Sequence, residues 1–240
     1  QRMDFGYTPL EHLYTNQTSP YFRAPHIYVA IAARFFPQKT VLTTEQAKTI
    51  QIDQAYFANS DGCSDAVFMT SRGGDKYDRT FMESFIRPGL GLNNWTSRTN
   101  YPALNVVPTG ANEMSLYVNQ DYAQQTAHLR RYSLRLDGFS SIKAPYTGGE
   151  MVTKVLTFVG KQLVLNYNTS AAGEIRVEIQ DKAGKPIDGF TLDECQTLVG
   201  NEVTRVVSWE KGSDVSELAG KEIRLRFSLK DANLYSLKFE

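Results

Sequence analysis

Two segments in the C-terminal part of the chain alternate strictly between apolar and polar residues. In Glu174–Gln180, isoleucine and valine alternate with charged or amide side chains, and Glu222–Leu229 repeats this pattern with Ile223, Leu225 and Phe227. Successive side chains of a strand point to opposite faces, so a period of two predicts strands with one buried and one solvated face. This part of the chain is therefore expected to form antiparallel β-structure.

Further short runs of β-branched and aromatic residues flank these two segments. Gly160-Lys161 lies between the runs Val152–Val159 and Gln162–Asn168, a spacing that predicts a two-residue hairpin. Val203–Trp209 and Asn233–Phe239 add two more expected strands. About seven short strands with turns between them predict a β-sandwich over residues 148–240.

The N-terminal part, residues 1–143, shows a weaker repeat. Tyr28, Phe68 and Tyr117 lie at matching points of strand-like stretches, 40 and 49 residues apart. A repeat of this length predicts propeller blades, although an ordinary β-meander with coincidental spacing fits equally well. The stretches supply about three blades, fewer than a closed propeller needs, so the propeller is expected to be incomplete. They are Ile27–Ala33; Ala66–Thr70 with Thr80–Phe85; and Met114–Asn119 with His128–Leu136.

Helix signals are poor, and the fold class is predicted to be all-β. Only Thr43–Ala47 suggests a short helical turn, with Thr44 as its cap. Two cysteines, Cys63 and Cys195, are too far apart for a metal motif, and they are either free thiols or a disulfide between the two halves. No P-loop, dinucleotide fingerprint, zinc pattern or Ser/His/Asp arrangement is present, so we expect no cofactor and no metal.

Charge and hydropathy exclude two classes of partner. The 26 basic residues balance the 26 acidic ones without a run of either sign, which argues against a nucleic-acid surface. The longest apolar run, Ile27–Phe36, contains Arg34 and is too short for a membrane span. Gln1 opens directly into polar, aromatic sequence without a signal peptide. The oligomeric state is left open.

Polar residues concentrate near the starts of the N-terminal strands. In a propeller, such positions from different blades converge at the central channel, where one carboxyl can protonate a leaving oxygen while another attacks or activates water. Each residue also has a plainer interpretation: Asp65 as a turn residue, Glu83 and Glu113 as solvated charges, His26 as a structural histidine. The candidates are Arg23, His26, Asp65, Arg72, Arg79, Glu83, Arg87, Trp95, Arg98 and Glu113.

Three stretches carry a resemblance to a known family. Phe22–Tyr28, Asp65–Gly74 and Phe81–Gly89 followed by Asn94-Trp95 resemble a bacterial group of glycoside hydrolases. That group is similar to the five-bladed propeller enzymes of glycosidase families 32 and 43 and carries a C-terminal β-sandwich. The resemblance implies that this chain holds the C-terminal blades of such a propeller, with the first blade upstream of Gln1.

The resemblance also implies chemistry. Those families use an Asp nucleophile or base, a supporting Asp and a Glu acid, but Arg23-Ala24-Pro25-His26 has Ala24 where an Arg-Asp-Pro motif would have Asp. Asp65 and Glu83 are then the expected catalytic carboxylates, with Glu83 as the proton donor. The other candidates would contact a poly- or oligosaccharide substrate, in an extracellular or periplasmic location.

Three functions compete at this point. The first is a glycosidase that works through Asp65 and Glu83. The second is a non-catalytic sugar-binding protein whose aromatic and arginine side chains contact glycans. The third is a purely structural β-protein. Geometry discriminates among them, because hydrolysis needs two carboxyls about 5–5.5 Å or 6.5–9.5 Å apart in an open pocket.

Overall fold

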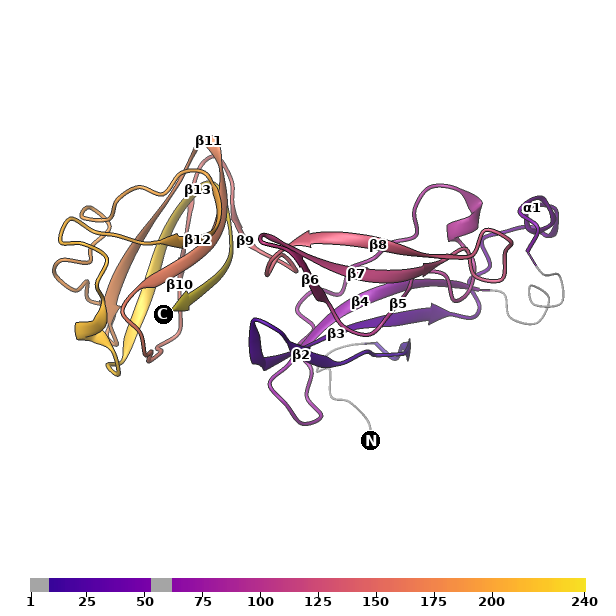
Figure 1. Ribbon diagram of the computed structural model, residues 1–240, viewed down its shortest axis with the longest axis horizontal. Helices are drawn as coiled ribbons and strands as arrows, with labels where there is room; N and C mark the ends of the chain where they lie inside the picture. Colours follow the sequence, from indigo (N-terminus) through magenta and orange to yellow (C-terminus); the bar gives the residue numbers. More distant parts are fainter. Residues whose placement is uncertain (1–8, 53–61) are drawn as a thin grey trace. The chain divides into compact units, whose positions relative to one another are not determined.

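The computed structural model describes residues 9–52 and 62–240. The chain divides into two compact units, whose bounds are Gln1–Ser133 and Leu134–Glu240 (Figure 1). Strands make up 48% of the chain and helices 5%, which confirms the all-β class. Among the described residues, no helix has the length and apolar character that a bilayer crossing requires.

The first unit begins with a four-stranded sheet centred on one long strand. The strands β1 and β2 share one edge of β3, and β4 pairs along the other edge. In the antiparallel register, Arg34 is opposite Asp65 and Tyr28 is opposite Ser71. The bounds are β1 His12–Tyr14, β2 Ser19–Tyr21, β3 Ala24–Phe36 and β4 Cys63–Ser71.

A second sheet of the first unit repeats this plan. Two short strands, β5 and β6, share one edge of the central strand β7, and β8 pairs along the other edge. Met114, Leu116 and Val118 of β7 are buried, and Tyr117 between them is exposed, as a period of two requires. The bounds are β5 Tyr101–Pro102, β6 Val107–Gly110, β7 Glu113–Gln120 and β8 His128–Arg135.

The expected repeat differs from the observed sheets in two places. Ile27–Ala33 and Ala66–Thr70, expected in separate blades, are neighbours in one sheet. Thr80–Phe85 is not a strand, because the chain there meets β4 only through the isolated bridges Thr70–Asp78 and Ala66–Ile86. Between these two bridges, the segment Asp78–Ile86 has nine residues, whereas the facing part of β4, Ala66–Thr70, has five. The longer segment therefore loops out of the ladder. The described strands form no closed barrel or propeller, and the propeller stays a prediction.

Short helices occur at three places. In α1 (Thr44–Thr49), the cap is Thr43 rather than the expected Thr44, because the Thr43 side chain accepts from the Gln46 N–H. The Gln46 side chain in turn accepts from the Thr43 N–H, which completes a capping box. Two 3₁₀ turns are Leu92–Asn94 and Ser216–Leu218.

The second unit is built from two long strands. β11 and β13 pair antiparallel almost from end to end, with an irregularity between Thr169 and Glu174 where both strands turn (Figure 1). Residues from both halves of each strand, such as Tyr167 and Ile175 or Phe227 and Leu234, line one apolar core. The sheet order is β10-β13-β11-β12 with β9 beside β13; the bounds are β9 Ile142–Ala144, β10 Gly149–Val152, β11 Leu163–Asp181, β12 Asn201–Val206 and β13 Ile223–Phe239.

This arrangement corrects the expected set of short strands. Gln162–Asn168 and Glu174–Gln180 belong to one continuous strand, and so do Glu222–Leu229 and Asn233–Phe239. No hairpin forms at Gly160-Lys161, because the N–H groups of Lys161 and Gln162 bond to the carbonyl of Glu240 instead. The buried face predicted for Glu174–Gln180 is confirmed, since its isoleucine and valine side chains are fully buried.

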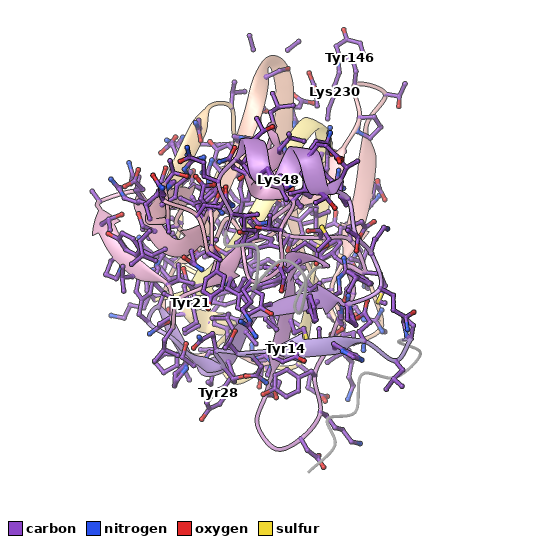
Figure 2. All side chains as sticks on the ribbon, turned by 90° about the vertical axis from the view of Figure 1, so that its right-hand side faces the viewer. Tyr14, Tyr21, Tyr28, Lys48, Tyr146 and Lys230 are labelled. Carbon is purple, nitrogen blue, oxygen red and sulfur yellow. The ribbon has the colours of Figure 1, made fainter. Side chains whose placement is uncertain are left out.

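The turn in the two long strands has little room for a side chain. A Cβ at Gly173 would lie 2.4 Å from the Asp231 carbonyl oxygen and 2.7 Å from that of Lys230. Asp231 itself adopts a positive φ of 41°, and the Lys230 ammonium lies over the Tyr146 ring at 4.9 Å (Figure 2). The close approach of the two backbones therefore depends on glycine at position 173.

We expect Gly173→Ala to lower the free energy of unfolding by about 2 kcal/mol, because the new methyl group forces the two long strands apart. Gly149→Ala in β10 is the matched control, since its Cβ would make an ordinary 3.7 Å contact with Ala144. The control should change stability by less than about 0.5 kcal/mol. Urea unfolding followed by circular dichroism measures both, and equal stabilities for the two variants would contradict the prediction.

Candidate functional site

The predicted site residues divide between the two ends of the sheets of the first unit. Asp65 lies near the start of β4, and Ser71 closes the same strand six residues later. At about 3.3 Å per residue, the two positions are about 20 Å apart. We call these ends the Asp65 end and the Ser71 end.

The Ser71 end holds four of the candidates. Arg23 and His26 lie at the start of β3, and Arg72 follows β4 directly. Glu113 starts β7 at this end, because its neighbour Met114 accepts a hydrogen bond from the Tyr21 hydroxyl at 3.5 Å. His26 and Arg72 are exposed, and the carboxylate of Glu113 pairs with Arg131. These residues are too distant from Asp65 to share a substrate ring with it.

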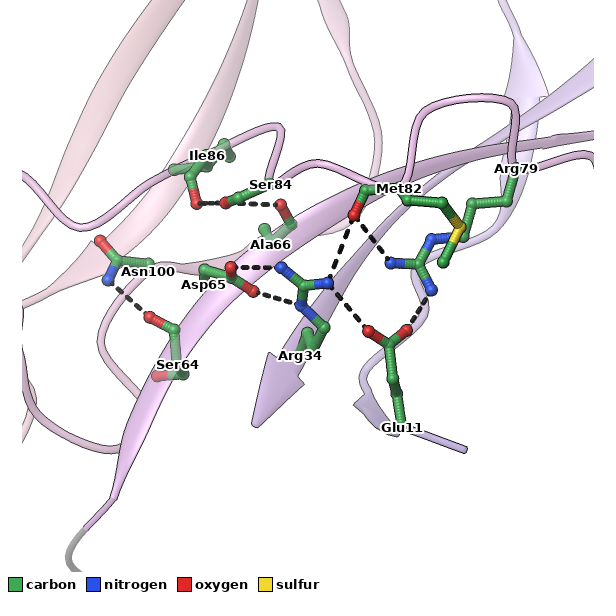
Figure 3. Close-up of polar contacts among 10 residues, drawn as sticks. All are labelled: Glu11, Arg34, Ser64, Asp65, Ala66, Arg79, Met82, Ser84, Ile86 and Asn100. Carbon is green, nitrogen blue, oxygen red and sulfur yellow. Dashed lines mark hydrogen bonds and ion pairs between the residues drawn. The ribbon is translucent and has the colours of Figure 1, made fainter. Parts of the chain in front are cut away.

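At the Asp65 end, four charged side chains form a chain of alternating sign (Figure 3). Arg34 donates to both carboxylate oxygens of Asp65, from Nε at 2.8 Å and from Nη2 at 2.6 Å. Its Nη1 donates to Glu11 at 2.9 Å, and the other Glu11 oxygen accepts from Arg79. Arg34 and Arg79 also donate to the Met82 carbonyl. The network therefore ties four chain segments together.

Burial makes these contacts strong. The side chains of Glu11, Arg34 and Asp65 are 9–13% exposed, and that of Arg79 is 1% exposed. Burial acts to raise the pKa of Glu11, but the hydrogen bonds from Arg79 and Arg34 outweigh it and lower that pKa below its ordinary value. The hydrogen bonds with Asp65 raise the pKa of Arg34 further above its ordinary value. Glu11 and Arg34 are therefore both charged at neutral pH.

This geometry engages Asp65, one of the two expected catalytic carboxylates, in an ion pair. Both oxygens of Asp65 are occupied by one guanidinium, and Arg34 stands between Asp65 and Glu11. Glu83 is exposed and has no ion pair with any described residue. Arg87, two residues before Gly89, is exposed as well. The arrangement suits a structural ion-pair network better than general acid–base chemistry, which needs a carboxyl free to exchange a proton.

Next to the charge network lies a second, uncharged one. The Asn100 amide donates to the carbonyl of Ser64 at 3.0 Å, and the Gln120 amide donates to the Asn100 oxygen at 2.9 Å. The Ser64 hydroxyl donates to the Thr99 carbonyl at 2.6 Å, and the Thr99 hydroxyl accepts from the Tyr122 N–H at 3.0 Å. Ser64, Thr99, Asn100 and Gln120 are 0–1% exposed. Buried amides and hydroxyls satisfied in this way hold the loops rigidly.

Two residues of the loops beside this uncharged network are conformationally strained. Arg98 and Ala123 both have φ of 61°, in the left-handed region that residues other than glycine, asparagine and aspartate rarely adopt. Asn100 and Asp121 also have positive φ, which their side chains tolerate. The two loops adjoin, because the Asn119 amide donates to the Arg98 carbonyl at 3.1 Å. Strain that the surroundings enforce is concentrated at functional sites in proteins.

These loops and the turn before them carry three side chains that are not fully buried. The exposed Arg98 guanidinium lies 5.6 Å from the centre of the half-buried Tyr122 ring. Trp95, three residues before Arg98, is half-buried and fixed by its indole N–H, which donates to the Gly89 carbonyl at 3.2 Å. We call Trp95, Arg98 and Tyr122 the loop surface. Trp95 and Arg98 were predicted from the sequence, but Tyr122 was not. Its position depends on a hydrogen bond with Thr99, 23 residues earlier in the sequence.

The described residues offer no other obvious reaction centre. They contain no group of three or more His, Cys, Asp or Glu side chains placed to hold a metal ion. Cys63 and Cys195 are both buried free thiols, and burial raises the pKa of each. A cavity of about 510 Å³ in the second unit, next to Gly160, is lined by none of the predicted site residues.

Comparison with known proteins adds no assignment. No protein-family model matches the chain, and no curated protein or solved structure matches it either.

We expect Asp65→Asn to lower the free energy of unfolding by about 3 kcal/mol, because it removes the bidentate one of the two carboxylate partners of the buried Arg34 guanidinium. Glu113→Gln removes a carboxylate from an ion pair with Arg131 whose side chains are 40–48% exposed, and it should cost less than about 1 kcal/mol. Urea unfolding measures both variants. A smaller loss for Asp65→Asn than for Glu113→Gln would show that the buried network is not structural.

The lowered pKa of Glu11 predicts a pH dependence of stability. The unfolded chain binds a proton at Glu11 near pH 4.5, whereas the folded protein binds it only at lower pH, so stability falls as pH decreases below that value. Glu11→Gln should show a shallower loss between pH 5 and the acid transition, as measured by thermal unfolding in a pH series. Parallel curves for the variant and the wild-type protein would contradict this.

Proposed function

We propose that this chain is a carbohydrate-binding β-protein and that it binds glycan at the loop surface of Trp95, Arg98 and Tyr122. The observation that supports this is the strain in the two adjoining loops. Arg98 and Ala123 have positive φ there, next to the buried hydrogen bonds of Ser64, Thr99, Asn100 and Gln120. Such a cost is retained where side chains must be held in one arrangement.

The chemistry of the loop surface suits a sugar ring. Aromatic faces pack against the apolar C–H groups of a pyranose, and guanidinium N–H groups donate to its hydroxyls. Because the loops are held before binding, little conformational entropy remains to be lost when a ligand arrives. The resemblance to carbohydrate-active proteins is the reason for proposing this ligand class, and the accessible aromatic and arginine side chains support this position for it.

The propeller architecture is part of the same proposal. The two sheets of the first unit share one plan, in which a split edge strand, a central strand and a third strand follow one another. That repetition favours two blades over a meander with coincidental spacing. On this proposal, the three expected stretches correspond to two blades, with the second unit as an accessory β-domain.

A glycosidase is the second candidate, favoured by the same repetition of blade-like sheets and by the resemblance. It would make the protein a secreted bacterial hydrolase of polysaccharide with Glu83 as its acid. In that case Asp65 would support the site through Arg34 rather than act as the nucleophile, since both of its oxygens are engaged. The proposed binding function needs no free carboxylate pair and is therefore preferred.

We expect Trp95→Ala and Tyr122→Ala each to weaken glycan binding about tenfold, because a stacking face is lost in each. Tyr132→Ala on β8 is the matched control, since Tyr132 is also half-buried but lies in a strand outside the strained loops. Affinity electrophoresis against a panel of plant and microbial polysaccharides measures binding.

The same panel separates binding from hydrolysis. Release of reducing sugar that Glu83→Gln abolishes, while binding persists, would establish the glycosidase and refute a purely binding role. Loss of binding in Tyr132→Ala equal to that in the loop variants would refute the loop surface as the site.

A further inference from the structure

We infer that the outer edge of β8 is a docking site for an extended segment of another protein chain, in which acidic and apolar side chains alternate. The segment adds to the second sheet as a further strand, with its backbone hydrogen-bonded to β8. This interaction goes beyond the proposed glycan binding and does not involve the loop surface.

The outer edge of β8 is open. Among the described strands β8 pairs with β7 alone, whereas the segment Asp78–Ile86 partly covers the corresponding edge of β4 in the first sheet (Figure 1). Every residue from His128 to Arg131 is exposed, so neither face of this part of β8 is covered. The backbone N–H and C=O groups along such an edge can pair with an added strand.

One face of β8 carries exposed apolar groups. The Arg131 guanidinium donates to the Ser115 hydroxyl at 2.8 Å, so the two side chains lie on the same face of the sheet. Side chains two residues apart in a strand share a face, which adds Tyr117 of β7 and Leu129 of β8 to it. Leu129 is 65% exposed and Tyr117 is 38% exposed. Apolar side chains of an added strand would cover this surface.

The opposite face of β8 is cationic. It carries His128 and Arg130, which alternate along the strand with Leu129 and Arg131. Nδ1 of His128 lies 4.0 Å from a carboxylate oxygen of Asp121. Arg130 is exposed and forms no ion pair or hydrogen bond with any described residue. Its guanidinium is therefore the charge on this face that a carboxylate of an added strand would pair with.

The charges decide which strand can be added. Residues 122–136 hold three arginines and one histidine and no acidic residue. A second copy of β8 would bring arginines close to arginines, and like charges on facing strands destabilise their pairing. A segment with alternating acidic and apolar residues instead places carboxylates on the Arg130 face and apolar side chains on the Leu129 face. Backbone hydrogen bonds then give affinity, and the alternate side chains give specificity.

The first test uses short synthetic peptides in which glutamate alternates with valine, with binding to the wild-type protein measured by fluorescence anisotropy. Replacing every glutamate with lysine should weaken binding about tenfold, because Arg130 repels the lysines. Binding of the glutamate peptide should also weaken as sodium chloride is raised. Equal binding of the acidic and basic peptides, or no binding of either, would overturn the inference.

Backbone methylation tests whether the peptide binds as a strand. Successive N–H groups of an extended strand point to opposite edges, so those of the glutamates face one way and those of the valines the other. Methylating one set should abolish binding, and methylating the other set should preserve it. Docking through side chains alone does not distinguish the two sets, so equal binding of the two methylated peptides would overturn strand addition.

Two variants of the protein locate the site. Arg130→Glu should reverse the preference from the acidic to the basic peptide, and Leu129→Thr should weaken binding of the acidic peptide about fivefold, because an apolar contact is lost. Lys48→Glu in α1 makes the same change of charge at an exposed residue of the same unit and should leave the preference intact. Equal effects of Arg130→Glu and Lys48→Glu would show attraction by net charge alone and would overturn the inference.

Discussion

The guanidinium of Arg34 connects several segments of the first unit. Arg34 bonds to Asp65 across the register of β3 and β4, and the same group reaches Glu11 before β1 and the carbonyl of Met82 beyond β4. A one-residue slip of β4 would turn Asp65 to the opposite face and leave the buried Arg34 with one carboxylate partner, Glu11, instead of two. The network therefore fixes the strand register as well as the position of the segment that loops over the sheet.

The same network explains why carboxylates at a strand end do not form an acid–base pair here. A catalytic pair needs unequal environments and a space between the two groups for a sugar. Asp65 and Glu11 instead share Arg34 between them and are nearly inaccessible. The loop that holds Arg98 in the left-handed region is tied to β4 next to Asp65, because the Asn100 amide donates to the carbonyl of Ser64.

The sequence predicted strands and faces better than it predicted their partners. Alternation identified Glu174–Gln180 correctly, because burial on one face is a local pattern. It could not show that this segment continues through residues 170–173 into one long strand, since the serine, two alanines and glycine there resemble a turn. The position of Arg34 within an apolar run indicates a buried charge. Its partner Asp65 is 31 residues away in sequence, however, and their pairing depends on the register of the two strands. The position of Tyr122 likewise depends on a hydrogen bond with a residue distant in sequence, Thr99.

The outer edge of β8 carries charged side chains. In the first sheet, the segment from Asp78 to Ile86 partly covers the outer edge of β4, whereas β8 pairs with β7 alone among the described strands. An exposed strand edge invites unwanted pairing, and arginines such as Arg130 on β8 oppose it.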